Sequence, residues 1–299
     1  MLNPVRAATE RLPRRPKLAY DLQRSQLTRV ARGIARPAYD FGTREEVLGL
    51  VEGKTCIVTG GAGSLGLASV RALLAEGAKV MLVDLDADKL AGTVRELGTN
   101  RAAFVAADVT DAAQTRNYVG ATVDMWGKID VLFSNAGNDG PLAPITDYPE
   151  DQFDRIMATH VRGCFLACKY TIPQMNDGGS IIVTSSTVGI KGVPGNCSYV
   201  AAKHALMGIV RGVAKEVASR RIRVNSVNPG PVDNAFMRTA EETMSKVIGR
   251  DAGEWFDEQI PFGRHAKPEE IAQAVCFLAS DRSGYTSGMA LMVDGGFCA

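Results

Sequence analysis

The feature that most limits the folds open to this chain is a regular alternation of short apolar runs and longer helical stretches. It begins near Gly53 and continues almost to the C-terminus. A parallel strand can return to its sheet only through a crossover, so strands that alternate with helices favour right-handed β-α-β units. We therefore predict an α/β fold: a doubly wound parallel sheet with helices on both faces, in a single domain.

The residues behind this prediction fall into two sets. Apolar and β-branched residues dominate the expected strands, at residues 56–58, 80–83, 104–105, 131–133, 181–183, 223–224 and 291–293. Residues with helical periodicity form the expected helices, which include 67–76, 112–125, 201–218 and 269–279.

Charge divides the chain into an Arg-rich N-terminal extension, residues 1–51, and a folded domain, residues 52–299. From Met1 to Arg36 there are nine basic and two acidic residues, a local charge of +7. The net charge of the whole chain is +1, so the remainder carries −6. A globally basic nucleic-acid-binding protein is therefore not expected.

The extension contains one segment with the spacing of an amphipathic helix. Leu27, Val30 and Ile34 would share one face of that helix, and Arg29 and Arg32 another. Such a helix could be an organelle-targeting leader, a membrane-surface contact or a nucleic-acid contact. It could also belong to an extension that packs on the folded domain or on a neighbouring subunit, or that stays mobile. The sequence favours such an extension over the other three roles.

The remaining composition is typical of a soluble globular protein in the cytoplasm. Hydrophobic residues make up 45% and charged residues 22% of the chain. No apolar run approaches the roughly 18 residues of a membrane span, and no secretory leader opens the chain. The six cysteines are scattered without a C-x-x-C pair, which predicts reduced thiols.

One cluster raises the question of a metal site. His160, Cys164 and Cys168 recur at helical spacing and would share one face, where metal ligation is conceivable. Two cysteines at such positions are more simply small buried hydrophobic residues. We predict no metal.

A glycine-rich turn follows the first expected strand and opens a helix. Gly61, Gly63 and Gly66 match G-x-G-x-x-G, directly after Gly60. Glycines permit a sharp turn and let backbone N–H groups approach a pyrophosphate at the helix N-terminus. In this context the motif predicts dinucleotide binding, although the alternative is a glycine-rich turn without a ligand.

The second expected strand ends at Asp84, which bears on the choice of dinucleotide. A carboxylate there can accept hydrogen bonds from both ribose hydroxyls of NAD, and it repels the 2′-phosphate of NADP. No Arg or Lys lies in the turn or directly after Asp84. We therefore predict NAD as the cofactor. The alternative is an aspartate that caps the next helix.

Ser186, Tyr199 and Lys203 form the expected catalytic group. Tyr199 and Lys203 are four residues apart, so on a helix they share a face. A nearby ammonium favours phenolate, which can take a proton from an alcohol while hydride leaves for nicotinamide. The Ser186 hydroxyl would hold the substrate oxygen. The alternative is an amphipathic helix with a surface lysine.

From Gly53 to the C-terminus the chain resembles the short-chain dehydrogenase/reductase superfamily in its compact, single-domain form. The resemblance rests on the motifs above and on Asp108-Val109, Asn135-Ala136-Gly137, Asn228-Pro229-Gly230 and residues 284–296. It implies a Rossmann-like catalytic domain that forms a homodimer or homotetramer. The implied cofactor-binding residues are Gly60, Gly63, Ser64, Leu65, Gly66, Asp84, Asp108, Val109, Asn135, Ala136, Gly137, Tyr199, Lys203, Pro229, Gly230, Val232 and Asn234.

The resemblance also implies particular roles. Asp108 and Val109 would border the adenine, residues 135–137 would line the cofactor, and residues 229–232 would meet the nicotinamide carboxamide. Tyr199 would be the acid/base, with Lys203 as both its activator and a ribose ligand.

The chain departs from the family pattern at three positions. Ser64 occupies the place of the second glycine of the turn, which puts a Cβ near the pyrophosphate. Asn234 stands where relatives carry Thr, and it could still hydrogen-bond the carboxamide. His160 aligns with an Asn that holds a water in a proton relay through the lysine. His160 could hold the same water, simply pack, or titrate near neutrality as a further catalytic residue.

In this family residues 231–261 would form a substrate lid. Its large apolar side chains suit a small hydrophobic alcohol or ketone, unless they face the core or a partner subunit; they are Phe236, Met237, Met244, Trp255 and Phe256. We expect oxidation of a hydrophobic secondary alcohol, alicyclic or steroid-like, with NAD. The alternatives are a carbonyl or 3-oxoacyl reductase and a non-catalytic, nicotinamide-binding regulatory protein.

Overall fold

The structure, a computed structural model, describes residues 49–299. The basic helix expected in the N-terminal extension lies outside the described residues. Residues 49–51, assigned to the extension from the sequence, pack against the folded body. Val51 is fully buried, and the Leu50 N–H donates to the Glu76 carboxylate at 2.8 Å.

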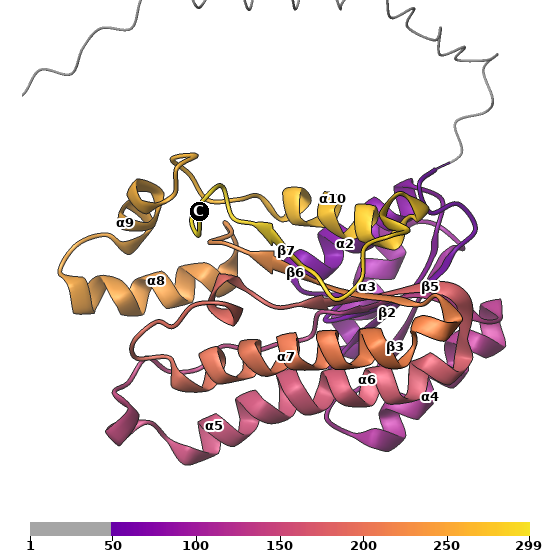
Figure 1. Cartoon of the computed structure of the whole chain (residues 1–299), viewed down its shortest axis with the longest axis horizontal. Helices are drawn as coiled ribbons and strands as arrows, with labels where there is room; N and C mark the ends of the chain where they lie inside the picture. The colour runs from indigo at the N-terminus through magenta and orange to yellow at the C-terminus, as the bar shows by residue number, and fades with distance from the viewer. Residues whose placement is uncertain (1–48) are drawn as a thin grey trace, which may run out of the picture. The chain divides into compact units, whose positions relative to one another are not determined.

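Seven strands form one parallel sheet in the order β3-β2-β1-β4-β5-β6-β7 (Figure 1). Most of their side chains are buried, as the apolar runs of the sequence predict for a sheet covered on both faces. The strands are β1 (Thr55–Thr59), β2 (Lys79–Asp84), β3 (Ala102–Ala106), β4 (Ile129–Ser134), β5 (Met175–Thr184), β6 (Arg223–Pro229) and β7 (Ala290–Val293).

Helices cover both faces of the sheet, which confirms the predicted fold class (Figure 1). One layer consists of α2 (Ser64–Ala75), α3 (Ala87–Leu97) and α10 (Pro268–Ala279). The other consists of α4 (Ala112–Trp126), α6 (Gly163–Thr171) and α7 (Cys197–Glu216), with α5 (Glu150–Met157) leading into α6. Beyond one end of the sheet lie α8 (Ala235–Ile248) and α9 (Ala252–Gln259). None of the helices described here is both long and apolar enough to cross a membrane.

The strand order reverses between β1 and β4, and this reversal places the site. The chain builds outward from β1 to β3 and then returns to start β4 on the other side of β1. Ligands of doubly wound sheets bind at such a switch point, beyond the carboxyl ends of the strands. The side chain of Thr59, the last residue of β1, holds the two loops together, because its Oγ1 accepts the N–H groups of Asn135 at 3.0 Å and Ala136 at 3.1 Å.

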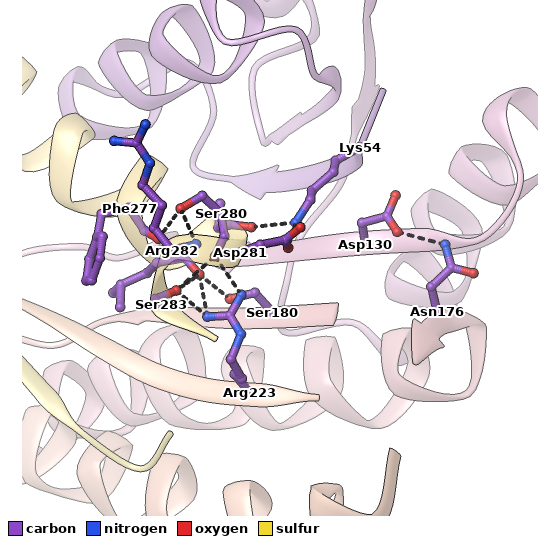
Figure 2. A network of polar contacts seen from close by, with 12 residues as sticks. Lys54, Asp130, Asn176, Ser180, Arg223, Phe277, Ser280, Asp281, Arg282 and Ser283 are labelled. Atoms are coloured by element: carbon purple, nitrogen blue, oxygen red, sulfur yellow. Dashed lines mark hydrogen bonds and ion pairs between the residues drawn. The ribbon is translucent and has the colours of Figure 1, made fainter. Parts of the chain in front are cut away.

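A buried arginine ties the end of α10 to the sheet (Figure 2). Arg223, the first residue of β6, donates to the carbonyls of Leu278 at 2.8 Å and Ser280 at 3.2 Å, and to the Ser283 hydroxyl. The Ser180 hydroxyl of β5 donates to the same Leu278 carbonyl at 2.7 Å. The last carbonyls of a helix have no partner within it, so this guanidinium supplies the hydrogen bonds that α10 lacks.

Removing this guanidinium should destabilise the fold. In Arg223→Met the buried carbonyls of Leu278 and Ser280 lose their charged donor, and we expect the free energy of unfolding to fall by about 2–4 kcal/mol. Urea unfolding measures the change. The control is Arg95→Met, at an exposed position of α3, which should stay within about 0.5 kcal/mol of the parent. Equal unfolding midpoints for the two variants would contradict the structural role of Arg223.

Candidate active site

The glycine-rich turn between β1 and α2 is shaped for residues without a side chain. Gly60 has φ 66°, in the left-handed region, and a Cβ there would lie 3.0 Å from Ala136 Cα. A Cβ on Gly66 would lie 2.0 Å from the Gly60 carbonyl oxygen, which no side chain can tolerate. Glycine at both positions therefore lets α2 start directly against the end of β1.

The N-terminus of α2 is open for an anion. Gly63 is the N-cap of this helix, and no side chain caps it. Ser64 at the first helical position is exposed, so its Cβ does not fill the turn from within. Uncapped N–H groups and the positive end of the helix dipole favour a phosphate. The turn fits the pyrophosphate of a dinucleotide on these grounds, with Leu65 following on the same helix.

Asp84 lies at the carboxyl end of β2, beside this turn. Its carboxylate accepts the N–H of Ala62 at 3.0 Å and of Leu85 at 2.8 Å. The next helix, α3, is capped by Asp86, which accepts the N–H of Lys89 at 2.9 Å. Asp84 is therefore not a helix cap, and its carboxylate is held where an adenine ribose would lie against the turn.

Two further segments lie at the same edge of the sheet. Asp108 and Val109 follow β3, and Val109 packs against Gly163, where an added Cβ would lie 3.0 Å from Val109 Cγ2. Asn135 follows β4, and its amide donates to the Thr59 carbonyl at 3.2 Å and accepts from the Thr184 hydroxyl at 2.9 Å. The loop after β4 is thereby bound to both neighbouring strands.

Tyr199 and Lys203 occupy one face of α7, as their spacing predicts. The Lys203 ammonium is buried, donates to the Thr184 carbonyl at 2.8 Å and lies 5.1 Å from the centre of the Tyr199 ring. The Ser186 side chain, just past β5, lies near the Tyr199 phenol, and its hydroxyl accepts the Val188 N–H at 3.3 Å. The structure thus brings the three predicted catalytic residues together.

Burial controls the ionisation of this group. Burial raises the pKa of the Tyr199 phenol, the Asp139 carboxylate raises it further, and the hydrogen bond with Ser186 lowers it. Burial also lowers the pKa of Lys203 to about 7. The sequence led us to expect that Lys203 would depress the pKa of the phenol. In the protein alone desolvation disfavours both charged forms, and the ammonium lies over the ring.

His160 lies in a π-helical turn, Ala158–Arg162, between α5 and α6. Its Nε2 is 2.9 Å from the Asn138 carbonyl oxygen and 3.2 Å from the Asn138 nitrogen, and its ring meets the Tyr199 ring edge-on at 5.5 Å. Burial, with the Lys203 charge, lowers the pKa of His160 to about 3. The ring is therefore neutral around neutral pH, which favours hydrogen bonding or packing over a titrating role.

The same helix face does not gather metal ligands. Cys164 and Cys168 are buried in the apolar core on that side of the sheet, while His160 turns toward Asn138. Within residues 49–299 no group of three or more His, Cys, Asp or Glu side chains is placed to hold a metal ion.

The segment after β6 differs in one respect from what the sequence suggested. Gly230 lies so close to Asp294 that an added Cβ would be 2.9 Å from its Cα, and Val232 is buried. The Asn234 side-chain oxygen accepts the Met237 N–H at 2.8 Å and so caps α8. Only its amide N–H groups remain to meet a carboxamide, and they can donate to a carbonyl oxygen. Pro229 ends β6 beside this segment.

The lid residues divide into two sets. Phe236 on α8 lies 6.1 Å from the Tyr199 ring, between ring centres, and is 40% exposed. Trp255 and Phe256 on α9 pack against each other at 4.9 Å. Phe236 therefore lies beside Tyr199, whereas Phe256 of the α9 pair also packs against His265 and Phe297, outside the expected lid.

Two residues of the candidate site were not identified from the sequence. Thr184 supplies the carbonyl that holds Lys203, but a main-chain contact leaves no residue-type signal. Asp139 lies two residues after the predicted segment 135–137 and acts on the Tyr199 phenol through its charge. A carboxylate so close to a cofactor-lining motif was the signal that could have identified it.

Comparison with known proteins agrees with this geometry. The family model described as enoyl-(acyl carrier protein) reductase matches residues 60–298. The chain is 36% identical over 258 residues to the uncharacterized oxidoreductase YxbG of Bacillus subtilis, covering 84% of this chain and 93% of that protein. It is 36% identical over 250 residues to the 3-oxoacyl-[acyl-carrier-protein] reductase FabG of Thermotoga maritima, covering 82% and 98%.

Solved structures of similar proteins also superpose on this chain. The crystal structure of levodione reductase superposes with a TM-score of 0.78 at 33% identity, covering 82% of this chain and 97% of that one. A blue fluorescent protein from a metagenomic library, in complex with NADPH, gives 0.75 at 33% identity, covering 83% and 99%.

The surroundings of two helical glycines predict that alanine weakens cofactor binding at one position and raises stability at the other. Gly66→Ala drives a Cβ into the Gly60 carbonyl, so the turn must open, and we expect the affinity for NADH to fall by at least about tenfold, or 1.4 kcal/mol. Gly92→Ala, on α3 with open space around it, should raise the free energy of unfolding by about 0.5–1 kcal/mol and leave binding unchanged. NADH fluorescence titration and urea unfolding provide the two readouts. Parent-like NADH affinity in a folded Gly66→Ala variant would contradict the tight-turn account.

Proposed function

Since this chain belongs to the short-chain dehydrogenase/reductase superfamily, we propose that it oxidises a hydrophobic secondary alcohol with NAD, using Tyr199 as the acid/base. The observation that carries the proposal is the Tyr199–Lys203 pair on one face of α7, with the Ser186 hydroxyl beside the phenol. Phe236, next to the Tyr199 ring, supports an apolar substrate.

The chemistry follows from the groups around the phenol. In oxidation the Tyr199 oxygen accepts the proton of the substrate hydroxyl while the carbinol carbon loses a hydride and becomes a ketone carbon. A bound nicotinamide supplies the hydride acceptor, or the hydride donor in the reverse direction. The Ser186 hydroxyl hydrogen-bonds the substrate oxygen and so orients it. Lys203 is held near the Tyr199 ring by the Thr184 carbonyl, and its positive charge would favour a phenolate, although in the protein alone burial outweighs this effect.

His160 is proposed as a positioning residue. Its contacts fix the Asn138 backbone and the Tyr199 ring on opposite sides of one imidazole. Its Nδ1 is buried and has no partner among the described residues, so it is available to hold a water molecule near Lys203. Holding that water is one of the three roles that the sequence left open for His160.

The proposed cofactor site runs along the carboxyl ends of the strands. The glycine-rich turn would bind the pyrophosphate, Asp84 the adenine ribose, and Asp108 and Val109 the adenine. Residues 135–137 would line the cofactor, and residues 229–234 would meet the nicotinamide. The preference for NAD rests on the Asp84 carboxylate, which is held toward the turn.

A second candidate function is a carbonyl reductase of the 3-oxoacyl type. The relative FabG, a 3-oxoacyl-[acyl-carrier-protein] reductase by name, favours it. A strong preference for NADPH would support this alternative over alcohol oxidation with NAD.

The third candidate function is a non-catalytic, nicotinamide-binding regulatory protein. The grouping of Ser186, Tyr199 and Lys203 argues against it. Binding of NAD without turnover of any alcohol or ketone would support it.

We further propose a homodimer or homotetramer in the cytoplasm. The exposed apolar side chains Ile145 (72%) and Phe165 (49%) lie on the side of the molecule that carries α5 and α6, and a partner subunit would cover them. The six free cysteines, four of them buried, suit a reducing compartment.

The cofactor preference should depend on the charge of Asp84. In Asp84→Asn the acceptor oxygen for the turn persists but the charge that repels a 2′-phosphate is lost. We expect the ratio of kcat/KM for NAD to that for NADP to fall by at least about tenfold, equal to 1.4 kcal/mol. Asp86→Asn is the control, because it removes the same charge two residues away and asparagine caps α3 equally well. A parent that prefers NADP would refute the assignment.

The pH dependence should identify Tyr199 as the acid/base. Because the pKa of the phenol is raised, alcohol oxidation should accelerate as pH rises toward that pKa, whereas ketone reduction should keep its rate over the same range. Tyr199→Phe should lower kcat/KM in both directions by about 10²–10⁴, with NADH binding retained. Initial rates across pH, with NADH titration of the variant, measure this. Oxidation rates that do not change with pH, or an active Tyr199→Phe variant, would contradict it.

A further inference from the structure

The loop after β4 places a carboxylate beside the catalytic tyrosine. On one side of Asp139, the backbone of Asn138 is hydrogen-bonded to the His160 ring, which packs edge-on against the Tyr199 ring. On the other side, Gly140 lies against α7, where an added Cβ would be 3.3 Å from Ser198 Oγ. Both neighbours of Asp139 are therefore anchored to groups that adjoin Tyr199.

The same loop is fastened a second time through Tyr148. Its hydroxyl hydrogen-bonds the Ser198 hydroxyl, and a Cβ on Gly140 would lie 2.6 Å from the Tyr148 oxygen. Residue 140 must therefore be glycine for the loop to approach α7 this closely. These contacts fix the backbone beside Asp139.

The Asp139 carboxylate is poorly satisfied by the protein. Its one hydrogen bond from the described residues is from the Gly140 N–H at 2.9 Å, and no Lys or Arg among residues 49–299 forms an ion pair with it. Arg155 reaches this loop but donates to the Asp139 main-chain oxygen and to Gln152. A partly buried carboxylate with so few partners is costly unless another molecule donates to it.

The electrostatics agree with this position. Burial raises the pKa of Asp139, and the Asp139 carboxylate in turn raises the pKa of the Tyr199 phenol. The charge of the carboxylate therefore acts on the phenol, as expected for a loop whose residues on both sides of Asp139 adjoin groups next to Tyr199. A carboxylate or phosphate on the substrate beside the reacting carbon would be repelled there.

We propose that Asp139 is a specificity-determining residue, which selects alcohols that carry a second hydrogen-bond donor, a hydroxyl or an ammonium, next to the reacting carbinol. The substrate is then a ring or chain with an apolar body facing Phe236 and a vicinal donor facing Asp139. This inference rests on the proposed function for its substrate class, but the effect of the Asp139 charge on the Tyr199 phenol does not depend on turnover.

The first test compares substrates that differ only in the vicinal group. The kcat/KM with NAD is measured for cyclohexanol, 1,2-cyclohexanediol and 2-aminocyclohexanol. The parent should prefer the diol or the amino alcohol over cyclohexanol by at least about tenfold, and Asp139→Asn should lose most of this preference, because a charged acceptor is lost. A larger loss for the amino alcohol identifies an ammonium, and a larger loss for the diol a hydroxyl. Asp147→Asn, at an exposed position of the following turn, should leave the ratios unchanged.

Two readouts do not require catalysis. In the NAD-free protein, Asp139→Asn should lower the pKa of the Tyr199 phenol in an ultraviolet difference titration, with Tyr199→Phe identifying the signal. In the Tyr199→Phe protein saturated with NADH, adding Asp139→Asn should weaken binding of 2-aminocyclohexanol or 1,2-cyclohexanediol, whichever the parent prefers, by at least about tenfold. Unchanged substrate ratios together with an unchanged phenol pKa would overturn the proposal. If no alcohol is oxidised, the proposed function fails, and the binding measurement alone decides the role of Asp139.

Discussion

The site depends on a line of hydrogen bonds that crosses the sheet where the strand order reverses. Thr59 at the end of β1 holds the backbone of Asn135 after β4, and the Asn135 side chain accepts from Thr184 at the end of β5. The Thr184 carbonyl in turn accepts from the Lys203 ammonium on α7. The glycine-rich turn, the loop after β4 and the catalytic helix are thereby fixed relative to one another. One polar connection therefore joins the glycine-rich turn to the helix that carries Tyr199 and Lys203.

Low solvent exposure explains the chemistry around that line. Burial disfavours the phenolate of Tyr199 and the ammonium of Lys203, and it keeps His160 neutral. The protein alone therefore holds a neutral tyrosine, which is suited to give a proton. A bound ligand that carries a positive charge or hydrogen-bond donors would shift the equilibrium between the neutral phenol and the phenolate of Tyr199. The Asp139 carboxylate, which has few partners in the protein, makes the site sensitive to the polarity of the bound substrate.

Local patterns were sufficient to predict the sheet, the turn and the catalytic spacing, because each depends on residues close together in the chain. Lys203 shares a helix face with Tyr199 for that reason. The charge of Asp139 acts on Tyr199, sixty residues away, because a loop folds against α7, and no periodicity encodes this approach. Local spacing also could not show where the Lys203 ammonium lies relative to the phenol. The expected fall in the pKa of Tyr199 assumed that this cation lies near the hydroxyl. The ammonium instead lies over the ring, and burial decides the direction.

The central proposal is that the carbinol carbon of the substrate loses a hydride to nicotinamide while Tyr199 accepts the proton of the substrate oxygen. A single-turnover experiment with NAD and an alcohol deuterated at the carbinol carbon tests this claim most directly. The account predicts that deuterium appears on the reduced nicotinamide and that the step slows relative to the protiated alcohol. Formation of no reduced nicotinamide from any secondary alcohol, in protein shown to be saturated with NAD, would contradict it.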